Sequence, residues 1–527
     1  MTPLKLLLAA AVAAALPATA SAQGQIPDCD RACLIKLADD YTAADVVAAG
    51  AFRQPAPPGA PPPGVGAGAY GNLPEFCRVQ ATLTPTSDSD IKVEVWLPTD
   101  GWNGKFVGVG NGIWAGQITY SALAETLARG YAVASTDTGH TGNGLTAEWA
   151  VGHPEKLVDF GHRAVHEMTV TAKSAIRALY GRAPQHSFWN SCSTGGRQGL
   201  MAAHRYPNDY DAISAMAPAN PMTTLMTQSM WAGWQPQRAP GAALPMPKLT
   251  LLHRAAVGSC DRLDGAEDGL IGRPEACRFD PAMIQCKPGE DAPTCLSEAQ
   301  VGTAKALYDG IRDPAGKLLA PGWPVGSEMQ LGVVAGGPTP FPVALTYFSM
   351  LVFGNRPGWD WKSFDYVRDL EAGRAYGAEI LDVPSDGLRA FFARGGKLLM
   401  SHGWTDGLIP ATNALAFREG LLRALPAGQA RDQYRLFMVP GMDHCGGGAG
   451  ASQFDTLGAL DAWTASGRAP DTLLATRPSA TGGPPGAAPA TPRPPMTRPL
   501  CPYPAYARYN GSGDINDAAN FACVAPS

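Results

Sequence analysis

The chain has 527 residues, 45% of them hydrophobic and 17% charged, which is enough for one large core and a second domain. Its formal net charge of −5, without a basic cluster, predicts that nucleic acid is not a partner. Eleven cysteines predict disulfides and an oxidising compartment, and the odd count leaves one cysteine outside the intramolecular pairs.

The N-terminus has the layout of a secretory signal. Lys5 precedes an apolar run from Leu6 to Leu16, and the small residues Ala20-Ser21-Ala22 stand before Gln23. This is a charged start, an apolar centre and a small-residue cleavage site, and the apolar run is too short to span a membrane. We expect residues 1–22 to be a signal peptide, no membrane span, and a periplasmic or secreted mature protein.

Residues 23–75 are expected to form an N-terminal segment outside the main core. The stretch from Asp28 to Ala51 is helical in pattern. The proline- and glycine-rich stretch from Pro55 to Gly64 cannot bury a core, which predicts an extended surface loop.

From Phe76 onwards, strand and helix patterns alternate. Strands are predicted over 91–97, 105–110, 131–135 and 186–190, and helices over 122–129 and 164–180. Such alternation is typical of a mainly parallel sheet with helices on both faces. Residues 76–218 are therefore expected to be the first part of an α/β core.

The alternation stops after Pro218 and resumes near residue 385. Residues 219–384 are irregular in pattern, rich in Pro, Gly, Met and Trp, and contain four cysteines. The core pattern then returns as helix 388–394, strand 397–401, helix 413–425 and strand 434–439. We interpret 219–384 as an inserted lid domain, and 385–527 as the second part of the core with a C-terminal tail.

A serine stands where a strand gives way to a helix. In Ser191-Cys192-Ser193-Thr194-Gly195, the predicted strand 186–190 leads into a sharp turn that carries Ser193, and a helix begins at Gly195. This is the layout of a nucleophile elbow, although Ser191 replaces the usual first glycine. An ordinary Ser/Gly turn is the alternative.

An aspartate and a histidine follow two later strands. Asp406 comes after the 397–401 strand and His444 after the 434–439 strand, in the order Ser, Asp, His that α/β-hydrolases use. We predict Ser193 as the nucleophile, His444 as its base and Asp406 as the acid that orients the imidazole. Asp443 is the competing acid, but as the direct neighbour of His444 it is poorly placed to reach Nδ1.

Each of the two reacting residues has a cysteine as its neighbour. If Ser193 and His444 lie within hydrogen-bond reach, Cys192 and Cys445 come close enough to form a disulfide. The oxyanion hole needs two backbone N–H groups. We expect one from Thr194 and the other from the 110–116 loop, at Gly112 or Ile113.

An acidic, glycine-punctuated loop lies in the lid. Carboxylates of Asp261, Asp264 and Asp268, with the carbonyls of Ala266 and Leu270, would supply the hard oxygen ligands that Ca²⁺ prefers. The spacing is not that of an EF-hand, and a plain solvated loop is the alternative.

The motifs together resemble those of the tannase and feruloyl esterase family, which also contains mono(2-hydroxyethyl) terephthalate hydrolase. The resemblance covers roughly 76–523, and the Cys-Ser and His-Cys pairs are its most specific part. The matching stretches are Trp102-Asn103-Gly104-Lys105-Phe106, Thr136-Asp137-Thr138-Gly139-His140, Gly152-His153-Pro154-Glu155-Lys156, Asp159-Phe160-Gly161-His162-Arg163, Cys192-Ser193-Thr194-Gly195-Gly196-Arg197, Pro440-Gly441-Met442-Asp443-His444-Cys445 and Gly511-Ser512-Gly513-Asp514-Ile515-Asn516.

The resemblance implies an α/β-hydrolase fold with a large lid inserted after the nucleophile half, and the triad Ser193, Asp406 and His444. It implies structural Ca²⁺ at the lid positions above and no organic cofactor. It also implies a bridge from Cys77 to Cys33 or Cys29, with Cys33 preferred. The other implied disulfides are Cys192–Cys445, Cys260–Cys277, Cys286–Cys295 and Cys501–Cys523.

The implied activity is hydrolysis of small esters of aromatic acids, with hydroxycinnamate, gallate and terephthalate monoesters in that order. Lid aromatics are candidates for walls around a phenolic ring, although for any single one a place in the lid core is the better interpretation. They include Tyr347, Phe348, Phe353, Trp359 and Trp361. An acyltransferase and a non-catalytic ligand-binding homologue are the alternatives.

The chain departs from the family pattern at three places. Ser191 and Ile113 stand where the family usually has glycine, and Ile113 is expected to narrow the acyl pocket. The lid arginine that grips the terephthalate carboxylate has no clear counterpart, since neither Arg356 nor Arg368 aligns with it. That counts against a terephthalate monoester as the substrate.

Overall fold

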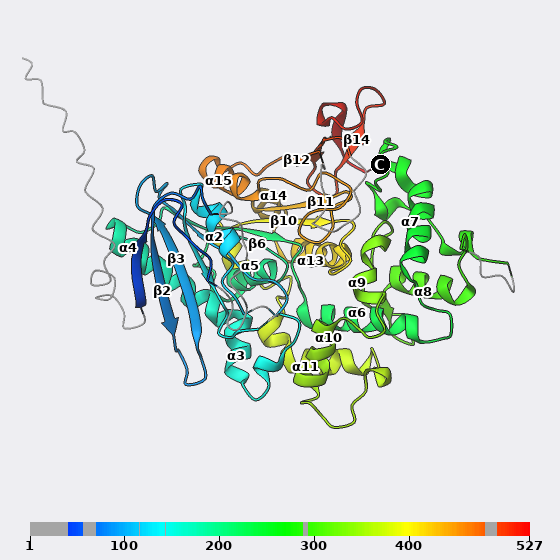
Figure 1. Ribbon diagram of the computed structural model, residues 1–527. Coiled ribbons are helices and arrows are strands. Elements are labelled where there is room, and N and C mark those ends of the chain that lie inside the picture. The colour runs from blue at the N-terminus through cyan, green and yellow to red at the C-terminus, as the bar shows by residue number, and fades with distance from the viewer. Residues whose placement is uncertain are drawn as a thin grey trace, which may run out of the picture.

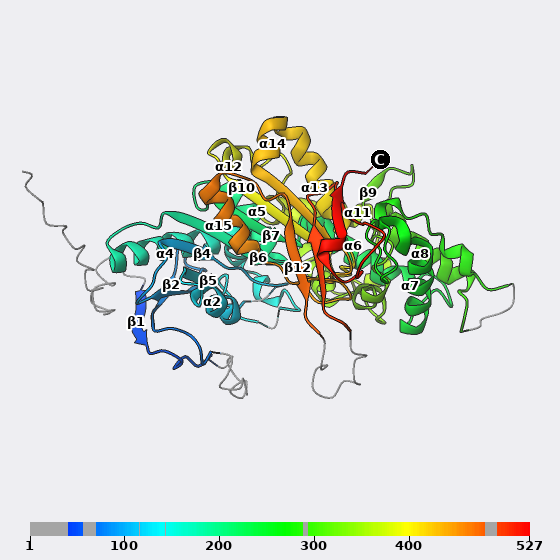
Figure 2. The ribbon, with the colours of Figure 1, turned by 90° about the horizontal axis from the view of Figure 1, so that it is seen from above.

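The computed structural model describes residues 41–55, 70–114, 116–142, 144–287, 293–479 and 493–526. The predicted signal peptide, residues 1–22, lies outside the described residues, as do Cys29 and Cys33. The three core elements of the molecule are a large sheet, the helices on its two faces, and the segment predicted as the lid (Figures 1 and 2).

One sheet of nine strands forms the centre of the fold. Five of its neighbouring pairs are parallel and three, at the N-terminal edge, are antiparallel. The predicted α/β class and mainly parallel sheet are confirmed. In spatial order the strands are β1 (Tyr41–Val47), β2 (Phe76–Leu83), β3 (Ile91–Pro98), β5 (Ala132–Thr136), β4 (Lys105–Gly108), β6 (His186–Cys192), β7 (Ala212–Met216), β10 (Lys397–Gly403) and β11 (Tyr434–Val439).

Helices cover both faces of the sheet and bury a separate apolar cluster on each. Because strand side chains alternate between the faces, a central strand such as β6 contributes Trp189 to one cluster and Phe188 to the other. On the first face lie α4 (Ala164–Tyr180), α5 (Thr194–Arg205), α12 (Arg389–Ala393), α13 (Ala411–Ala424) and α14 (Ala427–Gln433); on the second lie α2 (Tyr120–Leu127) and α15 (Thr456–Ser466).

The segment predicted as the lid is helical rather than irregular, which corrects the expectation for 219–384. Its helices surround a third apolar cluster, at the end of the molecule away from β1 and β2 (Figures 1 and 2). The sequence pattern hid α6 in particular, because this helix is buried on nearly all sides and has no polar face to give a helical period. The lid helices are α6 (Met222–Trp234), α7 (Met246–Cys260), α8 (Glu298–Asp309), α9 (Gly332–Ala335), α10 (Pro342–Thr346) and α11 (Arg368–Leu381).

A second correction concerns the helix expected over 28–51. Residues 41–47 form the edge strand β1, which pairs antiparallel with β2, while 28–40 lie outside the described residues. The alanines suggested a helix, but sheet pairing with Cys77 and Val79 overrides that local preference. Residues 41–47 therefore belong to the central sheet, although they precede the start of the predicted core at residue 76.

Three of the disulfides lie away from the sheet centre: Cys260–Cys277 and Cys286–Cys295 in the lid, and Cys501–Cys523 in the tail. Cys77 is also disulfide-bonded, and the choice between Cys29 and Cys33 falls outside the described residues. The tail contains two short sheets, β12 (Leu473–Arg477) with β13 (Met496–Leu500), and β14 (Tyr506–Tyr509) with β15 (Phe521–Val524).

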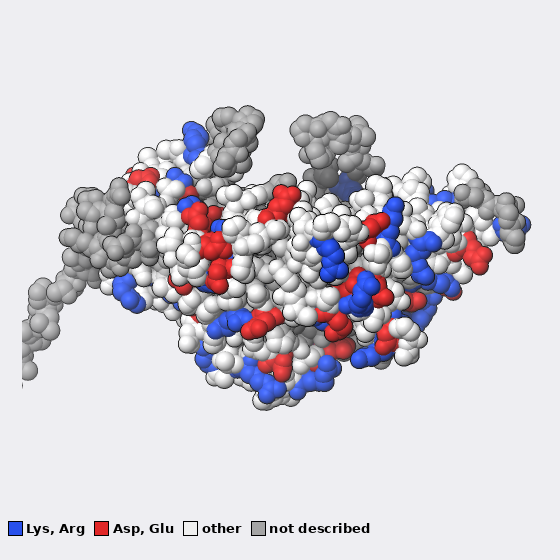
Figure 3. Space-filling model, turned by 90° about the horizontal axis from the view of Figure 1, so that it is seen from below, with Lys and Arg blue, Asp and Glu red and all other residues white. Residues whose placement is uncertain are grey.

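In the part of the chain that the structure describes, no helix is both long and apolar enough to cross a membrane. On the face shown in Figure 3, Lys and Arg side chains are interspersed with Asp and Glu. The expectation that nucleic acid is not a partner stays a prediction.

Candidate active site

Ser193 occupies a sharp turn between β6 and α5. Its backbone has φ 63° and ψ −127°, a conformation that L-residues rarely adopt and that the surrounding packing must maintain. The turn is braced on both sides, because Ser193 N–H donates to Met216 O at 2.9 Å and Arg197 N–H donates to Ser193 O at 3.1 Å. The serine side chain is thereby raised above the carboxyl ends of the parallel strands.

The departure at Ser191 is accommodated by the glycine opposite it. A Cβ added at Gly195 would lie 2.0 Å from Ser191 Oγ, so the serine fits only because residue 195 has no side chain. Ser191 Oγ in turn accepts a hydrogen bond from Gly110 N–H at 3.2 Å. Ser191 therefore ties the elbow to the start of the 110–116 loop.

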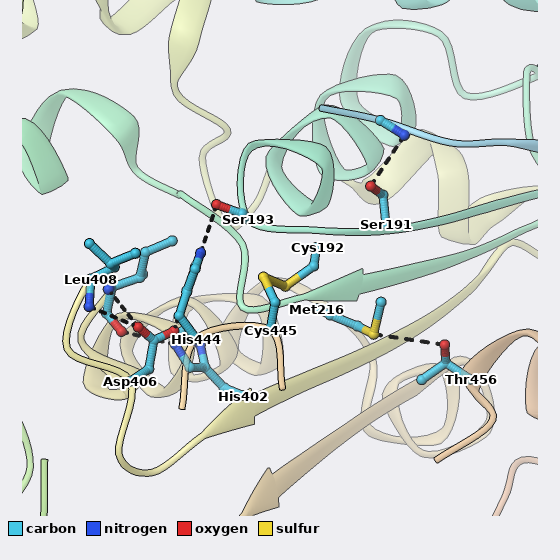
Figure 4. Close-up of a disulfide and its surroundings, with 12 residues drawn as sticks. Ser191, Cys192, Ser193, Met216, His402, Asp406, Leu408, His444, Cys445 and Thr456 are labelled. Atoms are coloured by element: carbon cyan, nitrogen blue, oxygen red, sulfur yellow. Dashed lines mark hydrogen bonds and ion pairs between the residues drawn. A yellow bond between two sulfur atoms is a disulfide. The ribbon is translucent and has the colours of Figure 1, made fainter. Parts of the chain in front are cut away.

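Three side chains from separate parts of the chain form a continuous hydrogen-bonded relay (Figure 4). Ser193 Oγ lies 2.9 Å from His444 Nε2, and His444 Nδ1 lies 2.8 Å from Asp406 Oδ2. Asp406 follows β10 and His444 follows β11, so each residue lies just beyond a strand end. The structure brings together all three residues predicted as the triad.

The Asp406 carboxylate is fully buried yet held in its charged form. Burial alone would raise its pKa, but the charge of His444 and hydrogen bonds from His402 and His444 outweigh burial and lower the pKa below its usual range. Its other oxygen, Oδ1, accepts the backbone N–H groups of Leu408 and Ile409 at 2.9 Å each. These donors fix the carboxylate plane toward His444.

His402 is a second histidine on Asp406 that the sequence reasoning missed. It is fully buried, and its Nε2 lies 3.1 Å from Asp406 Oδ2 and 3.0 Å from Ile409 O. Both partners are acceptors, so Nε2 carries the proton and donates to the acid. No sequence motif indicates His402. Only the folded loop after β10 brings Asp406 back against the imidazole of His402, four residues earlier in the chain.

Asp443, the competing acid, points away from the imidazole. Its carboxylate accepts from Thr405 Oγ1 at 2.8 Å and from Gln330 Nε2 at 2.8 Å. It therefore links the loop after β11 to the loop after β10 and to the lid.

A disulfide joins Cys192 and Cys445 directly beside the serine and the histidine (Figure 4). Their Cα atoms lie 5.9 Å apart across 253 residues of sequence. The bridge therefore ties the end of β6 to the loop after β11, next to the contact between Ser193 and His444.

A narrow cavity of about 40 Å³ adjoins Ser193 and His444. Ile113 and Thr194 line it, whereas Gly112 does not, and Thr194 Oγ1 donates to Ile113 O at 2.9 Å. The rest of its wall is mainly apolar: Ala219, Met222, Leu225, Met226, Phe341, Val343, Leu408 and Ile409.

The lid aromatics considered as pocket walls do not line this cavity, and the lid-core interpretation holds for them. Tyr347 and Phe348 are fully buried in the lid cluster, and Phe353, Trp359 and Trp361 pack against that cluster. Phe341 is the one aromatic residue among those described on the cavity wall. The five residues fill the lid core because an inserted helical domain needs its own large apolar side chains.

The acidic loop of the lid is stabilised by its own backbone. Asp261 accepts N–H groups from Asp268 and Gly269, and Asp268 also bonds Arg498 Nη2 at 2.6 Å. Burial, with added repulsion from Asp268, raises the pKa of Asp264 to about 7. Among the described residues, no group of three or more His, Cys, Asp or Glu is arranged as a metal cluster.

The close fit of Ser191 against Gly195 gives a stability prediction. Gly195→Ala should destabilise the protein by about 1–3 kcal/mol, the usual cost of overpacking, measured by denaturant unfolding. The matched double variant Ser191→Gly/Gly195→Ala should recover most of this loss, since it removes the clashing Oγ. A Gly195→Ala protein as stable as the wild type would contradict the packing described.

Comparison with known proteins places the chain in one family. The profile described as tannase and feruloyl esterase matches residues 77–524. The chain is 32% identical over 469 residues to a probable feruloyl esterase B-1 of Aspergillus flavus, covering 85% of this chain and 86% of that protein. It is also 32% identical over 564 residues to the mono(2-hydroxyethyl) terephthalate hydrolase of Piscinibacter sakaiensis, covering 92% and 89%.

The crystal structure of feruloyl esterase B from Aspergillus oryzae superposes with a TM-score of 0.80 at 26% identity, covering 92% of this chain and 96% of that one. The fold, the profile match and the identities agree. The chain belongs to the tannase and feruloyl esterase family and is a carboxylic ester hydrolase.

Proposed function

We propose that the chain is an exported serine esterase that cleaves esters of aromatic acids through an acyl-serine intermediate. The observation that carries the proposal is the relay from Ser193 through His444 to Asp406, with contacts of 2.9 and 2.8 Å, beside an apolar cavity. A nucleophile, a base within hydrogen-bond reach and an acid that orients the base are what acyl transfer requires.

In the first half of the reaction, His444 Nε2 takes the proton from Ser193 Oγ as the oxygen attacks the ester carbonyl. The ionised Asp406 stabilises the imidazolium that forms, and His444 then returns the proton to the leaving alcohol. Water, activated by the same imidazole, hydrolyses the acyl-serine. The side chain of His444 is 19% exposed, so water can reach the imidazole.

The oxyanion is stabilised by the backbone N–H of Thr194 and one from the 110–116 loop. Ile113 is the better second donor than Gly112, because it lines the cavity beside Ser193 and Thr194. Its φ of 48° is costly for a β-branched residue and indicates that the loop conformation is imposed by its surroundings.

The cavity favours an uncharged, apolar acyl group. Met222 and Met226 can adapt to a flat ring because methionine side chains are flexible and polarisable. None of the described residues on the cavity wall is Lys or Arg, and Arg356 and Arg368 contact Phe353 and Asp369 elsewhere in the lid. A terephthalate monoester would place its free carboxylate in this wall without a cation.

The test is hydrolysis of methyl ferulate, methyl gallate, mono(2-hydroxyethyl) terephthalate and p-nitrophenyl acetate by the purified, oxidised protein. We expect an aromatic methyl ester to be turned over best, and Ser193→Ala to lose about a thousandfold or more in kcat with an unchanged fold. Full activity of Ser193→Ala would show that Ser193 is not the nucleophile. Turnover of p-nitrophenyl acetate alone would contradict the assignment of aromatic acid esters as substrates.

Export is supported by the disulfides of the described chain, which persist in oxidising compartments. Sequencing of the mature N-terminus, expected at Gln23, tests it, and a retained Met1 would contradict it.

We also propose that the acidic loop of the lid binds a structural calcium ion. Asp261, Asp264 and Asp268 lie within one short loop, and the side chain of Asp268 is only 4% exposed. Carboxylate and carbonyl oxygens, including those of Ala266 and Leu270, are the donors that calcium prefers. The only cation that bonds Asp268 among the described residues is Arg498, and a calcium ion would add positive charge beside the three carboxylates. The ion takes part in no catalytic step.

Chelation tests this site through stability. EDTA should lower the Tm of the wild type by several degrees, because a ligand that binds only the folded state stabilises it. The matched variant Asp264→Asn should have a Tm that neither EDTA nor added calcium changes. A wild-type Tm that is indifferent to both treatments would overturn the proposal.

A further inference from the structure

One polar side chain on the cavity wall is not explained by the proposed chemistry. Ser229 lies on α6, is only 2% exposed, and lines the same cavity as Ser193 and His444. In the described part of the chain its hydroxyl has no hydrogen-bond partner. The hydroxyl oxygens of Ser214 and Ser401 are also without a partner, but they are completely enclosed by protein atoms. The Ser229 hydroxyl instead faces the cavity.

The other hydroxyls nearby are already committed. Thr194 Oγ1 donates to Ile113 O at 2.9 Å, and Thr227, on the same helix, donates to Thr223 O at 3.2 Å. Serine and threonine in helices commonly bond the carbonyl four residues back, and Ser229 does not. A buried polar group without a partner costs stability, so its retention in an apolar wall points to a ligand.

The geometry of α6 places Ser229 at the far end of the cavity. The helix begins beside the nucleophile, because Ala219 N–H donates to Ser193 O at 3.1 Å. Met222, Leu225, Met226 and Ser229 line the cavity at helical spacing, which is one face of α6. Ser229 lies seven residues beyond Met222, roughly 10 Å along the helix axis.

We propose that Ser229 determines specificity by hydrogen bonding a polar ring substituent, such as a phenolic hydroxyl, at the end of the acyl group remote from the ester. This inference rests on the proposed function. We assign the acyl group to this cavity because it stays bonded to Ser193 while the alcohol departs. A ring joined to the carbonyl through a two-carbon link reaches Ser229 better than a ring joined directly, which favours 4-hydroxycinnamates over 4-hydroxybenzoates.

The experiment compares kcat/KM for methyl 4-hydroxycinnamate and methyl cinnamate, which differ only in the ring hydroxyl. The wild type should prefer the hydroxylated ester, and Ser229→Ala should reduce that preference, the ratio of the two kcat/KM values, about tenfold. Alanine is a better helix former than serine, so the variant should fold. Thr227→Val is the matched control, since it removes a buried hydroxyl of α6 that does not line the cavity, and its preference should equal that of the wild type.

The outcomes separate this inference from the proposed function. If Ser229→Ala changes both esters by the same factor, or leaves the preference intact, the role of Ser229 is overturned. If its effect follows the alcohol instead of the acid, seen by comparing methyl and ethyl cinnamates, the assignment of the cavity to the acyl group is overturned. If the wild type hydrolyses neither cinnamate but cleaves p-nitrophenyl acetate, the aromatic substrate class itself fails.

Discussion

The disulfide between Cys192 and Cys445 is the constraint on which the site geometry depends. Ser193 follows β6 and His444 follows β11, and β7 and β10 lie between these strands. Neighbouring strands are about 4.8 Å apart, so the two loops must converge over roughly 14 Å of sheet edge. A bridge that closes 253 residues is worth roughly 5 kcal/mol in the chain-entropy model. Here it also holds together the two side chains that exchange a proton in the proposed reaction.

The lid supports the loop that contains Asp406. Trp323 Nε1 of the lid donates to Gly407 O at 3.0 Å, and Gln330 bonds Asp443, which in turn bonds Thr405. From the core side, His402 donates to Asp406. The acid loop is therefore held between the sheet and the lid, so the lid and the triad are expected to lose their order together.

Much of the core was predictable from the sequence. The helix 164–180 and the strand 434–439 have the predicted bounds, because their periodic patterns are long and their ends carry clear signals such as Gly181. The positions of Ser193, Asp406 and His444 followed from one rule, that catalytic residues stand after strands. Their cysteine neighbours made the pairing specific.

The remainder depends on tertiary contacts that local patterns do not encode. β1 forms because β2 offers an edge, and α6 has no polar face because the lid surrounds it. His402 and Ser229 look ordinary in the sequence. Only the folded structure shows that His402 donates to Asp406 and that Ser229 faces the cavity with no hydrogen-bond partner among the described residues.

The most direct test of this account compares Cys192→Ala/Cys445→Ala with Cys286→Ala/Cys295→Ala, which removes a lid disulfide spanning only nine residues. Hydrolysis of p-nitrophenyl acetate is measured at a temperature where circular dichroism shows both variants folded. We predict that kcat falls at least tenfold in the first variant and stays near the wild-type value in the second, because misplacing the base costs rate steeply. Wild-type kcat in a folded Cys192→Ala/Cys445→Ala protein would contradict the central role of the bridge.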